Sequence, residues 1–427
     1  MENRIIRIAL LGVGTVGTGV YKLLHMRSED MMQIAGANIE IAKILVHNIH
    51  KEREGIDRSL LTDNFQEIID DPTIDIVVEV MGGIEPAKSM ILQALHAGKH
   101  VVSANKDLIA VHGRELFDAA EENGCDFLFE AAVAGAIPII RPLKQCLAAN
   151  EITEVMGIMN GTTNFILTKM FEENMSFDDA LAIATELGYA EADPTADVEG
   201  LDAGRKAAIL ASLAFHSRVV FDDVYTEGIT KITKEDISYA KEFGSVIKLV
   251  GRARNTPEGI EVGVYPLLLP EDHPLAQIRN SFNAIYVYGD AVDEAMFMGR
   301  GAGEMPTASA VCGDIIDVTR NIMHGCCGRI SCTCYRQLPV KENKDVKHKF
   351  FIRMQVKNQP GVLAQVATVF GLHKVSITKV VQKMTGGEYT ELVIATEAVK
   401  EYRMRDALAL MKAIDQVQEI SSVIREF

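Results

Sequence analysis

The chain has 427 residues, enough for two or three domains that each bury a core of their own. Its formal net charge of −16 disfavours nucleic acid and anionic membrane surfaces as partners, and no stretch of twenty apolar residues offers a membrane span. Met1-Glu2-Asn3-Arg4 leads directly into the first expected strand, so we expect no signal peptide. The seven cysteines then indicate reduced thiols and a cytoplasmic protein.

The first expected element is a buried strand over residues 5–10, followed by a glycine-rich turn and a helix that runs to residue 24. This order is typical of a dinucleotide site, because the first glycine permits the turn, the second lets the pyrophosphate approach, and the third packs the helix on the strand. We therefore predict a dinucleotide site at Gly12, Gly14, Thr15, Val16 and Gly17.

Apolar strands alternate with amphipathic helices up to residue 129. Further strands are expected over residues 39–46, 74–80, 100–103 and 126–129, and helices over 86–97 and 113–122. The alternation predicts an α/β fold with a parallel, doubly wound Rossmann-like sheet over residues 1–130. Residues 131–311 mix their elements less regularly, with strands expected over 250–254, 260–269, 284–288 and 294–298. This part is predicted to be an α+β substrate and dimerisation domain.

Residues 188–206 hold the most informative cluster of polar groups. Four carboxylates precede an apolar helix expected over 207–215: Glu191, Asp193, Asp197 and Asp202. Asp202 lies four residues before Lys206, so on a helix the carboxylate and the ammonium share a face. A lysine held in this way can deliver a proton to a bound polar substrate. The competing interpretation is a solvated acidic loop with an ordinary surface ion pair.

Together these motifs resemble the homoserine dehydrogenase family over essentially the whole chain. The matching positions are Gly188-Tyr189-Ala190-Glu191, Asp193-Pro194, Asp197, Gly200, Asp202, Lys206, Asn105-Lys106, Asn160-Gly161-Thr162-Thr163-Asn164, and Gly301-Ala302-Gly303 followed by Pro306-Thr307-Ala308-Ser309-Ala310. The resemblance implies reversible hydride transfer between NAD(P)H and L-aspartate 4-semialdehyde, giving L-homoserine for threonine, methionine and isoleucine biosynthesis.

The resemblance also implies roles for individual residues. Lys206 is the expected proton donor, oriented by Asp202, and Lys106 faces it across the substrate and the cofactor. Glu191 and Asp197 are expected to bind the substrate ammonium, with Asp193 shaping the loop. Ser103, Lys106 and Gly303 are expected to join the cofactor site. The alternative function is a non-enzymatic amino-acid sensor with a degenerate Rossmann domain, against which the intact Lys206, Asp202 and Glu191 argue.

The choice of nicotinamide cofactor rests on the end of the second strand. Val46-His47-Asn48 offers no acid for the ribose hydroxyls of NAD, and Lys51 and Arg53 are the nearest candidates to bind a 2′-phosphate. We expect NADP, with NAD as the alternative. The resemblance further implies a monovalent cation, Na⁺, held by one carboxylate and three backbone carbonyls at Glu130, Val133, Gly135 and Ile137.

A helix over residues 306–323 is expected to complete the Rossmann domain, and residues 325–349 are expected to be a linker. Five possible metal ligands lie close together here: His324, Cys326, Cys327, Cys332 and Cys334. They lack paired Cys-x-x-Cys units, so we expect unligated thiols rather than zinc.

Residues 350–427 show a βαββαβ order that resembles an ACT domain, a ferredoxin-like module that senses amino acids. Strands are expected over 350–356, 376–382, 388–396 and 417–425, and helices over 361–370 and 402–414. We expect feedback by threonine, captured in the loop that contains Asn358 and Gly361, or else a dimerisation module without a ligand. Such modules pair edge to edge, and we expect a dimer or a tetramer.

Overall fold

The computed structural model describes residues 4–383 and 387–427. Met1, Glu2 and Asn3, on which the expectation about a signal peptide rests in part, lie outside the described residues. No helix in the described ranges combines the length and the apolar character that crossing a bilayer requires. The chain forms two compact units, one of Met1–Val155, Arg205–Phe221 and Asn283–Leu338, the other of Met156–Gly204, Asp222–Phe282 and Pro339–Phe427.

The strands are β1 (Ile5–Leu11), β2 (Asn38–Leu45), β3 (Leu61–Thr62), β4 (Ile74–Glu79), β5 (His100–Ser103), β6 (Phe127–Leu128), β7 (Ile152–Ile158), β8 (Tyr225–Thr226), β9 (Ser245–Thr256), β10 (Gly259–Pro270), β11 (Phe282–Gly289), β12 (Asp293–Arg300), β13 (Lys347–Lys357), β14 (Ile377–Lys383), β15 (Tyr389–Thr396), β16 (Val399–Lys400) and β17 (Val417–Glu426). The helices are α1 (Thr15–Met26), α2 (Ser28–Ala35), α3 (Gln66–Ile69), α4 (Ala87–His96), α5 (Lys106–Glu122), α6 (Gly161–Glu173), α7 (Phe177–Glu186), α8 (Thr195–Val198), α9 (Leu201–Phe215), α10 (Lys234–Glu242), α11 (Glu304–His324), α12 (Val362–Leu372) and α13 (Glu401–Met411).

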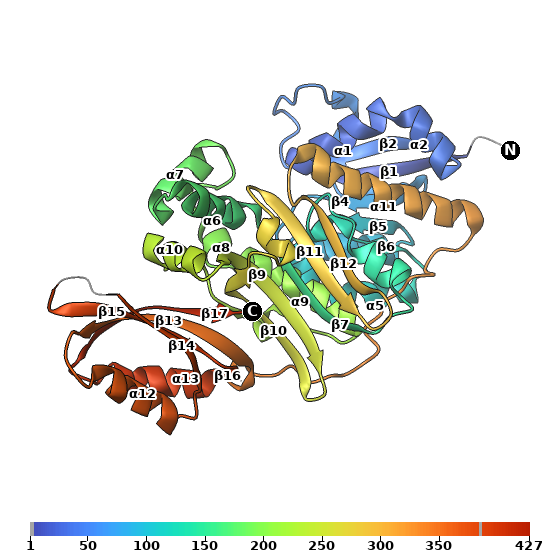
Figure 1. Cartoon of the computed structure of the whole chain (residues 1–427). Coiled ribbons are helices and arrows are strands. Elements are labelled where there is room, and N and C mark those ends of the chain that lie inside the picture. The colour runs from blue at the N-terminus through green and yellow to red at the C-terminus, as the bar shows by residue number, and fades with distance from the viewer. Residues whose placement is uncertain (1–3, 384–386) are drawn as a thin grey trace. The chain divides into compact units, whose positions relative to one another are not determined.

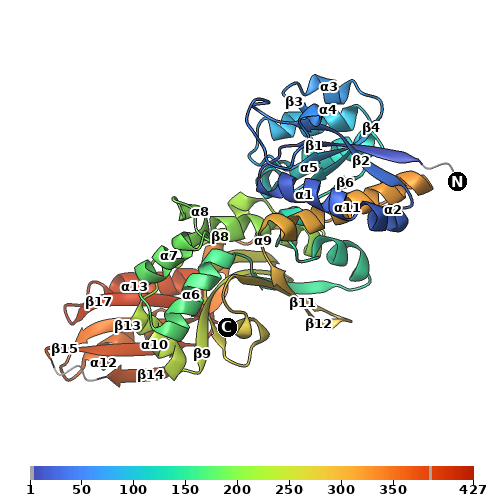
Figure 2. The ribbon, with the colours of Figure 1, turned by 90° about the horizontal axis from the view of Figure 1, so that it is seen from above.

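The first unit is built on a parallel sheet with the order β3-β2-β1-β4-β5-β6. The predicted parallel, doubly wound sheet is therefore confirmed. The strand order reverses between β1 and β4, and ligands of such sheets bind at the carboxyl ends of the strands at this point. Helices α1, α2 and α11 cover one face, where Val20, Met31 and Ile315 share a core with Leu10 of β1. Figures 1 and 2 show α11, drawn in orange, beside α1 and α2.

Two helices in this unit differ from the sequence prediction. The stretch between the first helix and the second strand, for which no element was predicted, forms α2, and Gly36 in the left-handed conformation is its C-cap. Helix α5 starts at Lys106 instead of residue 113, because Asn105 caps it by accepting a hydrogen bond from Leu108 N at 3.1 Å. Asparagine is a favoured N-cap, so the signal was present in the sequence. Strand β7 was not predicted.

In the second unit, β9 and β10 form a long antiparallel pair, and the C-terminal strands follow the antiparallel order β17-β13-β15-β14. Helices α12 and α13 pack on this C-terminal sheet around Phe350, Phe370 and Met404 (Figure 1). The predicted βαββαβ module is thus confirmed. A feature that was not predicted is that β17 also pairs with β10 in parallel, at Leu267 and Leu268.

Candidate active site

The glycine-rich turn places three glycines in three different environments. Gly12 has φ of +98°, and a Cβ added there would lie 3.0 Å from Met81 Cγ. A Cβ at Gly17 would lie 2.3 Å from the Gly12 carbonyl oxygen, so helix α1 packs directly on the turn. A Cβ at Gly14 would meet nothing within 4 Å, and Gly14 caps α1 without a side-chain bond. The open space in front of this helix N-terminus is suited to an anionic group such as a pyrophosphate.

A cavity of about 490 Å³ opens in front of this turn. Its lining consists of Gly12, Val13, Gly14, Leu45, Val46, His47, Lys51, Arg53, Asp63, Val80, Met81, Pro86 and Met90. Gly12, Gly14 and Lys51 were predicted for the cofactor site, and Thr15, Val16 and Gly17 form the first turn of the adjoining helix. Asp63 was not predicted, because it follows β3, a strand of two residues that is too short to leave a pattern.

A buried hydrogen-bond network lies at the carboxyl ends of β4 and β5. The Glu79 carboxylate, fully buried, accepts bonds from Ser103 Oγ at 2.7 Å and from the backbone N–H groups of Met81 and Gly82. Ser103 Oγ accepts from Asn105 N at 3.1 Å. Asn105 in turn caps the helix whose first residue is Lys106. Glu79 and Asn105, which we had not assigned, thereby position the start of α5.

The two lysines proposed for catalysis lie on α5 and α9. Lys106 is half-buried at the first position of α5, and Lys206 is buried in the second turn of α9. Their sequence neighbours form an ion pair, in which Arg205 Nε lies 2.7 Å from Asp107 Oδ1. This pair holds the beginnings of the two helices together. Asp202 and Lys206 lie one turn apart on α9, as the spacing predicted.

In the second unit, Asn160 brings two of the four predicted carboxylates together. Its Nδ2 donates to Asp197 Oδ1 at 2.6 Å and to Asp202 Oδ2 at 3.0 Å. Its Oδ1 accepts from Thr163 N at 2.9 Å and so caps α6. Asn160 belongs to a motif that matches the family, but the sequence did not predict that its side chain bridges Asp197 and Asp202.

The other two carboxylates of the loop, Asp193 and Glu191, are exposed, and neither accepts a hydrogen bond from Asn160 in the described part of the chain. Asp193 is exposed and accepts bonds from the backbone N–H and the hydroxyl of Thr195, at 3.1 and 2.6 Å. Those hydrogen bonds lower the pKa of Asp193 and hold the turn into α8, which confirms its predicted role in shaping the loop. Glu191 is exposed, two residues after Tyr189, whose carbonyl oxygen accepts a 2.7 Å bond from Thr162 Oγ1.

The segment expected to hold a cation is a tight buried turn. Ala134 and Gly135 both have positive φ, and the backbone of Gly135 lies against Gly301. The Glu130 carboxylate accepts hydrogen bonds from the backbone N–H groups of Ile139, Ile140 and Arg141, at 2.6 to 2.8 Å. Since these bonds occupy most of its acceptor sites, the backbone carbonyl oxygens fit the cation better than the carboxylate does.

Two of the remaining predicted site residues, Gly303 and Gly361, are glycines with positive φ next to the start of a helix. Gly303 has φ of +127° and immediately precedes α11. Gly361, with φ of +89°, is the N-cap of α12, and Asn358 N donates to the Glu388 carbonyl oxygen at 2.9 Å.

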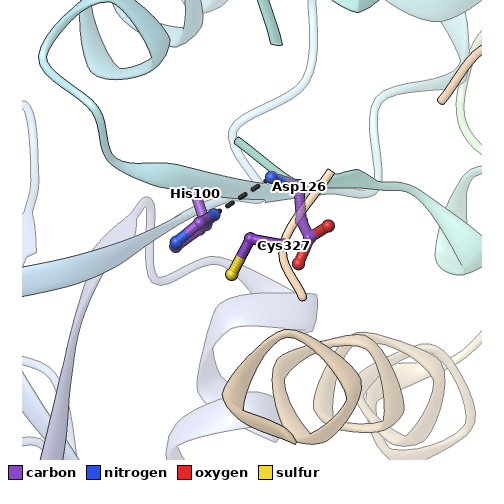
Figure 3. A group of neighbouring side chains, drawn as sticks. All are labelled: His100, Asp126 and Cys327. Carbon is purple, nitrogen blue, oxygen red and sulfur yellow. Dashed lines mark hydrogen bonds between the residues drawn. The ribbon is translucent and has the colours of Figure 1, made fainter. Parts of the chain in front are cut away.

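The cysteine-rich linker contributes to two separate clusters. Figure 3 shows Cys327 beside His100 and Asp126, with ligand-capable atoms within 4.8 Å of one another. Asp126 N donates to His100 Nδ1 at 3.0 Å, and the Asp126 carboxylate accepts from Gly328 N and Asn321 Nδ2. His100 Nδ1 and the Asp126 carboxylate are therefore already hydrogen-bonded within the protein. Cys332 and Cys334 lie elsewhere, beside Arg218 and Ser212.

Comparisons with known proteins match nearly the entire chain. Residues 12–130 match the family described as "Homoserine dehydrogenase, NAD binding domain", residues 138–316 match "Homoserine dehydrogenase", and residues 350–414 match "ACT domain". A homoserine dehydrogenase of Bacillus subtilis is 46% identical, over 98% of both chains. The structure of one from Thiobacillus denitrificans has a TM-score of 0.94 at 41% identity, covering 99% of this chain and 98% of that one. A hyperthermophilic archaeal homoserine dehydrogenase mutant in complex with NADPH has a TM-score of 0.63 at 28% identity, covering 74% and 98%.

Proposed function

Because the chain belongs to the homoserine dehydrogenase family, we propose that its acidic loop and its two lysines carry out the interconversion of L-aspartate 4-semialdehyde and L-homoserine. The protein is an oxidoreductase that acts on a CH–OH group and has an NAD(P)-binding domain. The alternative of a non-enzymatic sensor is not favoured, because the similarity to homoserine dehydrogenases extends over the whole catalytic region. The observation that carries the proposal is the Asn160 bridge between Asp197 and Asp202.

Reduction of an aldehyde needs a proton for the oxygen that becomes an alkoxide. When bound, the nicotinamide supplies the hydride. Lys206 is the proposed proton donor, because it is buried and lies one helical turn after Asp202. Lys106 is proposed as the second lysine at the reacting group, since the Arg205–Asp107 ion pair joins the N-terminal parts of the helices that carry both lysines.

Asp197 and Glu191 are proposed to bind the substrate ammonium. Asp197 is half-buried and held by Asn160, so it presents a fixed carboxylate, whereas Glu191 is exposed on the loop. A fixed carboxylate needs little reorganisation when a cation arrives.

NADP is the proposed cofactor. His47, Lys51 and Arg53 line the cavity in front of the glycine turn, and Asp63 adds a carboxylate to the same lining. Arg53 Nη1 donates to the carbonyl oxygens of Asn48 and Lys51, which holds this basic loop in place. The complex of NADPH with the archaeal relative is consistent with this preference. We expect Lys51→Ala to raise KM for NADPH and leave KM for NADH nearly unchanged.

Sodium is the proposed cation, at the turn from Glu130 to Ile137. The carbonyl oxygens of Val133, Gly135 and Ile137 would hold it, and it would stiffen the buried turn that packs on Gly301. Replacing Na⁺ by a bulky organic cation in the assay should then lower the melting temperature.

Threonine is the proposed effector of the ACT domain. A continuous set of contacts leads from this domain to the acidic loop. Arg425 of β17 is buried and binds Glu227 at 2.6 Å and Glu401 at 2.8 Å. Next to Glu227, Gly228 lies so close to Val198 that a Cβ would be 2.1 Å from its carbonyl oxygen. Val198 ends α8, the helix that contains Asp197.

An effector regulates only if it binds two states of the enzyme with different affinity. We expect millimolar threonine to slow the full-length enzyme, and Arg425→Lys to require more threonine for the same effect, because lysine keeps the charge but loses the two-pronged contact. Removal of everything after residue 340 is a weaker test, because it also strips Asp236 of its partner Arg353. A rate and a melting temperature that threonine leaves unchanged would exclude the feedback role.

The central test measures initial rates with homoserine and with aspartate semialdehyde, using each nicotinamide. Lys206→Ala and Lys106→Ala should each lose on the order of 10²-fold in kcat or more, as for a general acid. Glu191→Gln should chiefly raise KM for homoserine. Lys231→Ala, at an exposed lysine, is the matched control. A Lys206→Ala enzyme with near-native kcat would remove Lys206 from the mechanism.

The biosynthetic pathways, the cytoplasmic location and the dimer or tetramer stay predictions.

A further inference from the structure

Cys332 and Cys334 line a small cavity in the first unit that the proposed reaction does not use. The cavity holds about 20 Å³, roughly the space of one water molecule. Its walls include Ile109 and Phe117 of α5, Ser212 and Leu213 of α9, and the side chains of Lys144 and Arg218. The two thiols therefore lie against the helices that carry Lys106 and Lys206.

Basic groups surround the sulfur of Cys332. Arg218 Nη2 donates to Cys332 Sγ at 3.6 Å. Lys144 Nζ is buried without a hydrogen-bond partner among the described residues, and it lies 5.5 Å from the centroid of the Phe117 ring. Cys334 Sγ lies 3.6 Å from the Ser212 carbonyl oxygen. Positive charge in a poorly solvated cavity stabilises a thiolate.

Cys332 differs electrostatically from the buried cysteines. Burial raises the pKa of Cys125 to about 11 and that of Cys312 to about 12, and it raises the pKa of Cys327 to about 11. The Cys334 hydrogen bond, then Arg218 and Lys144, lower the pKa of Cys332 to about 6. The pKa of Cys334 is correspondingly raised. Cys332 is half-buried and free, so small reagents can reach it.

We propose that Cys332 and Cys334 form a thiol modification site, in which hydroperoxides oxidise the Cys332 thiolate and Cys334 resolves the product. The Cys332 sulfur attacks the peroxide; an S–O bond forms, the O–O bond breaks, and the departing alkoxide or hydroxide takes a proton from water. Sulfur loses two electrons to the peroxide and becomes a sulfenic acid. The Cys334 sulfur then displaces hydroxide, which leaves as water with the Cys334 proton, and a disulfide forms.

Oxidation at this site acts on the catalytic helices. An added oxygen atom has to fit a cavity that holds about one water molecule, and a disulfide removes the charge that Arg218 contacts. Both changes shift the packing between α5 and α9, so turnover should fall on oxidation and recover with a dithiol. A bond between cysteines two residues apart closes a small ring, and strained disulfides of this kind are readily reduced.

The first test compares Cys332 with Cys146, an exposed free cysteine, by timed alkylation with iodoacetamide and peptide mass spectrometry. At pH 6 the larger thiolate fraction of Cys332 outweighs its lower intrinsic nucleophilicity, so we expect it to react about tenfold faster than an ordinary thiol. Its rate should level off above about pH 7, whereas the rate of an ordinary thiol rises to about pH 9. A Cys332 rate that climbs in parallel with that of Cys146 overturns the proposal.

The second test treats the holoenzyme with hydrogen peroxide and traps sulfenic acid with dimedone. Wild-type protein should lose two hydrogens as the disulfide forms, and Cys334→Ser should accumulate the dimedone adduct on Cys332. Cys332→Ser should show neither product and should keep its turnover. Peroxide that leaves Cys332 unmodified refutes the site. Turnover that stays unchanged after Cys332 is fully modified refutes its coupling to α5 and α9.

Discussion

Asn160→Ser separates the two tasks of the residue that bridges the acidic loop. Serine is also a favoured N-cap, so it can keep the bond to Thr163 N that starts α6. It has no amide N–H groups, so the bonds to Asp197 and Asp202 are lost. A hydrogen bond to a charged group contributes about 1.5–3 kcal/mol. If one such bond is lost from the transition state, kcat/KM falls about 10- to 100-fold, at about 1.4 kcal/mol per tenfold.

The assay is the initial rate of homoserine oxidation, with thermal unfolding measured on the same samples. Loss of the bond to Asp197, the proposed ligand of the substrate ammonium, should raise KM. Loss of the bond to Asp202, which is expected to orient Lys206, should lower kcat, so both parameters should change. The control is Ser176→Ala, which removes the N-cap of α7, where Ser176 accepts from Asp179 N at 3.1 Å. It should cost about 1 kcal/mol of stability and leave kcat/KM unchanged. A folded Asn160→Ser enzyme within about twofold of the native kcat/KM would refute the bridging role.

Four further predictions concern the cofactor turn and the ACT domain. Gly14→Val should fold normally and abolish cofactor binding in calorimetry, because the added side chain enters open space in front of α1. Gly17→Ala should instead lower the melting temperature, since its Cβ would lie 2.3 Å from the Gly12 carbonyl oxygen; an unchanged melting temperature contradicts the packing. Arg353→Met should cost about 3–5 kcal/mol in urea denaturation, because it removes the ion-pair partner of the fully buried Asp236. Burial and nearby arginines lower the pKa of His348 to about 2. Below about pH 6.5 the imidazole of His348 is therefore protonated in the unfolded chain but stays neutral in the folded protein. Stability should therefore fall by up to about 1.4 kcal/mol per pH unit on acidification, a slope that His348→Phe should flatten.

Several features of the fold could be read from the chain because they depend on neighbours close in sequence. The alternation of strands and helices predicted the parallel sheet, and the βαββαβ order predicted the C-terminal module. The spacing of Gly12, Gly14 and Gly17 predicted a turn that has close contacts at Gly12 and Gly17 and open space at Gly14. The spacing of Asp202 and Lys206 likewise predicted one helical turn between them. Local periodicity carries such information because backbone geometry repeats over a few residues.

Other features depend on groups far apart in the chain, and no local pattern encodes them. Asn160 reaches Asp197 and Asp202 across 37 and 42 residues, and Glu79 reaches Ser103 across 24. The parallel pairing of β17 with β10 joins the end of the chain to a strand more than a hundred residues earlier. The sequence by itself determined which residue types were available and most of the helices and strands that present them. Tertiary packing decided which polar groups meet, because a buried carboxylate requires partners wherever the fold places them.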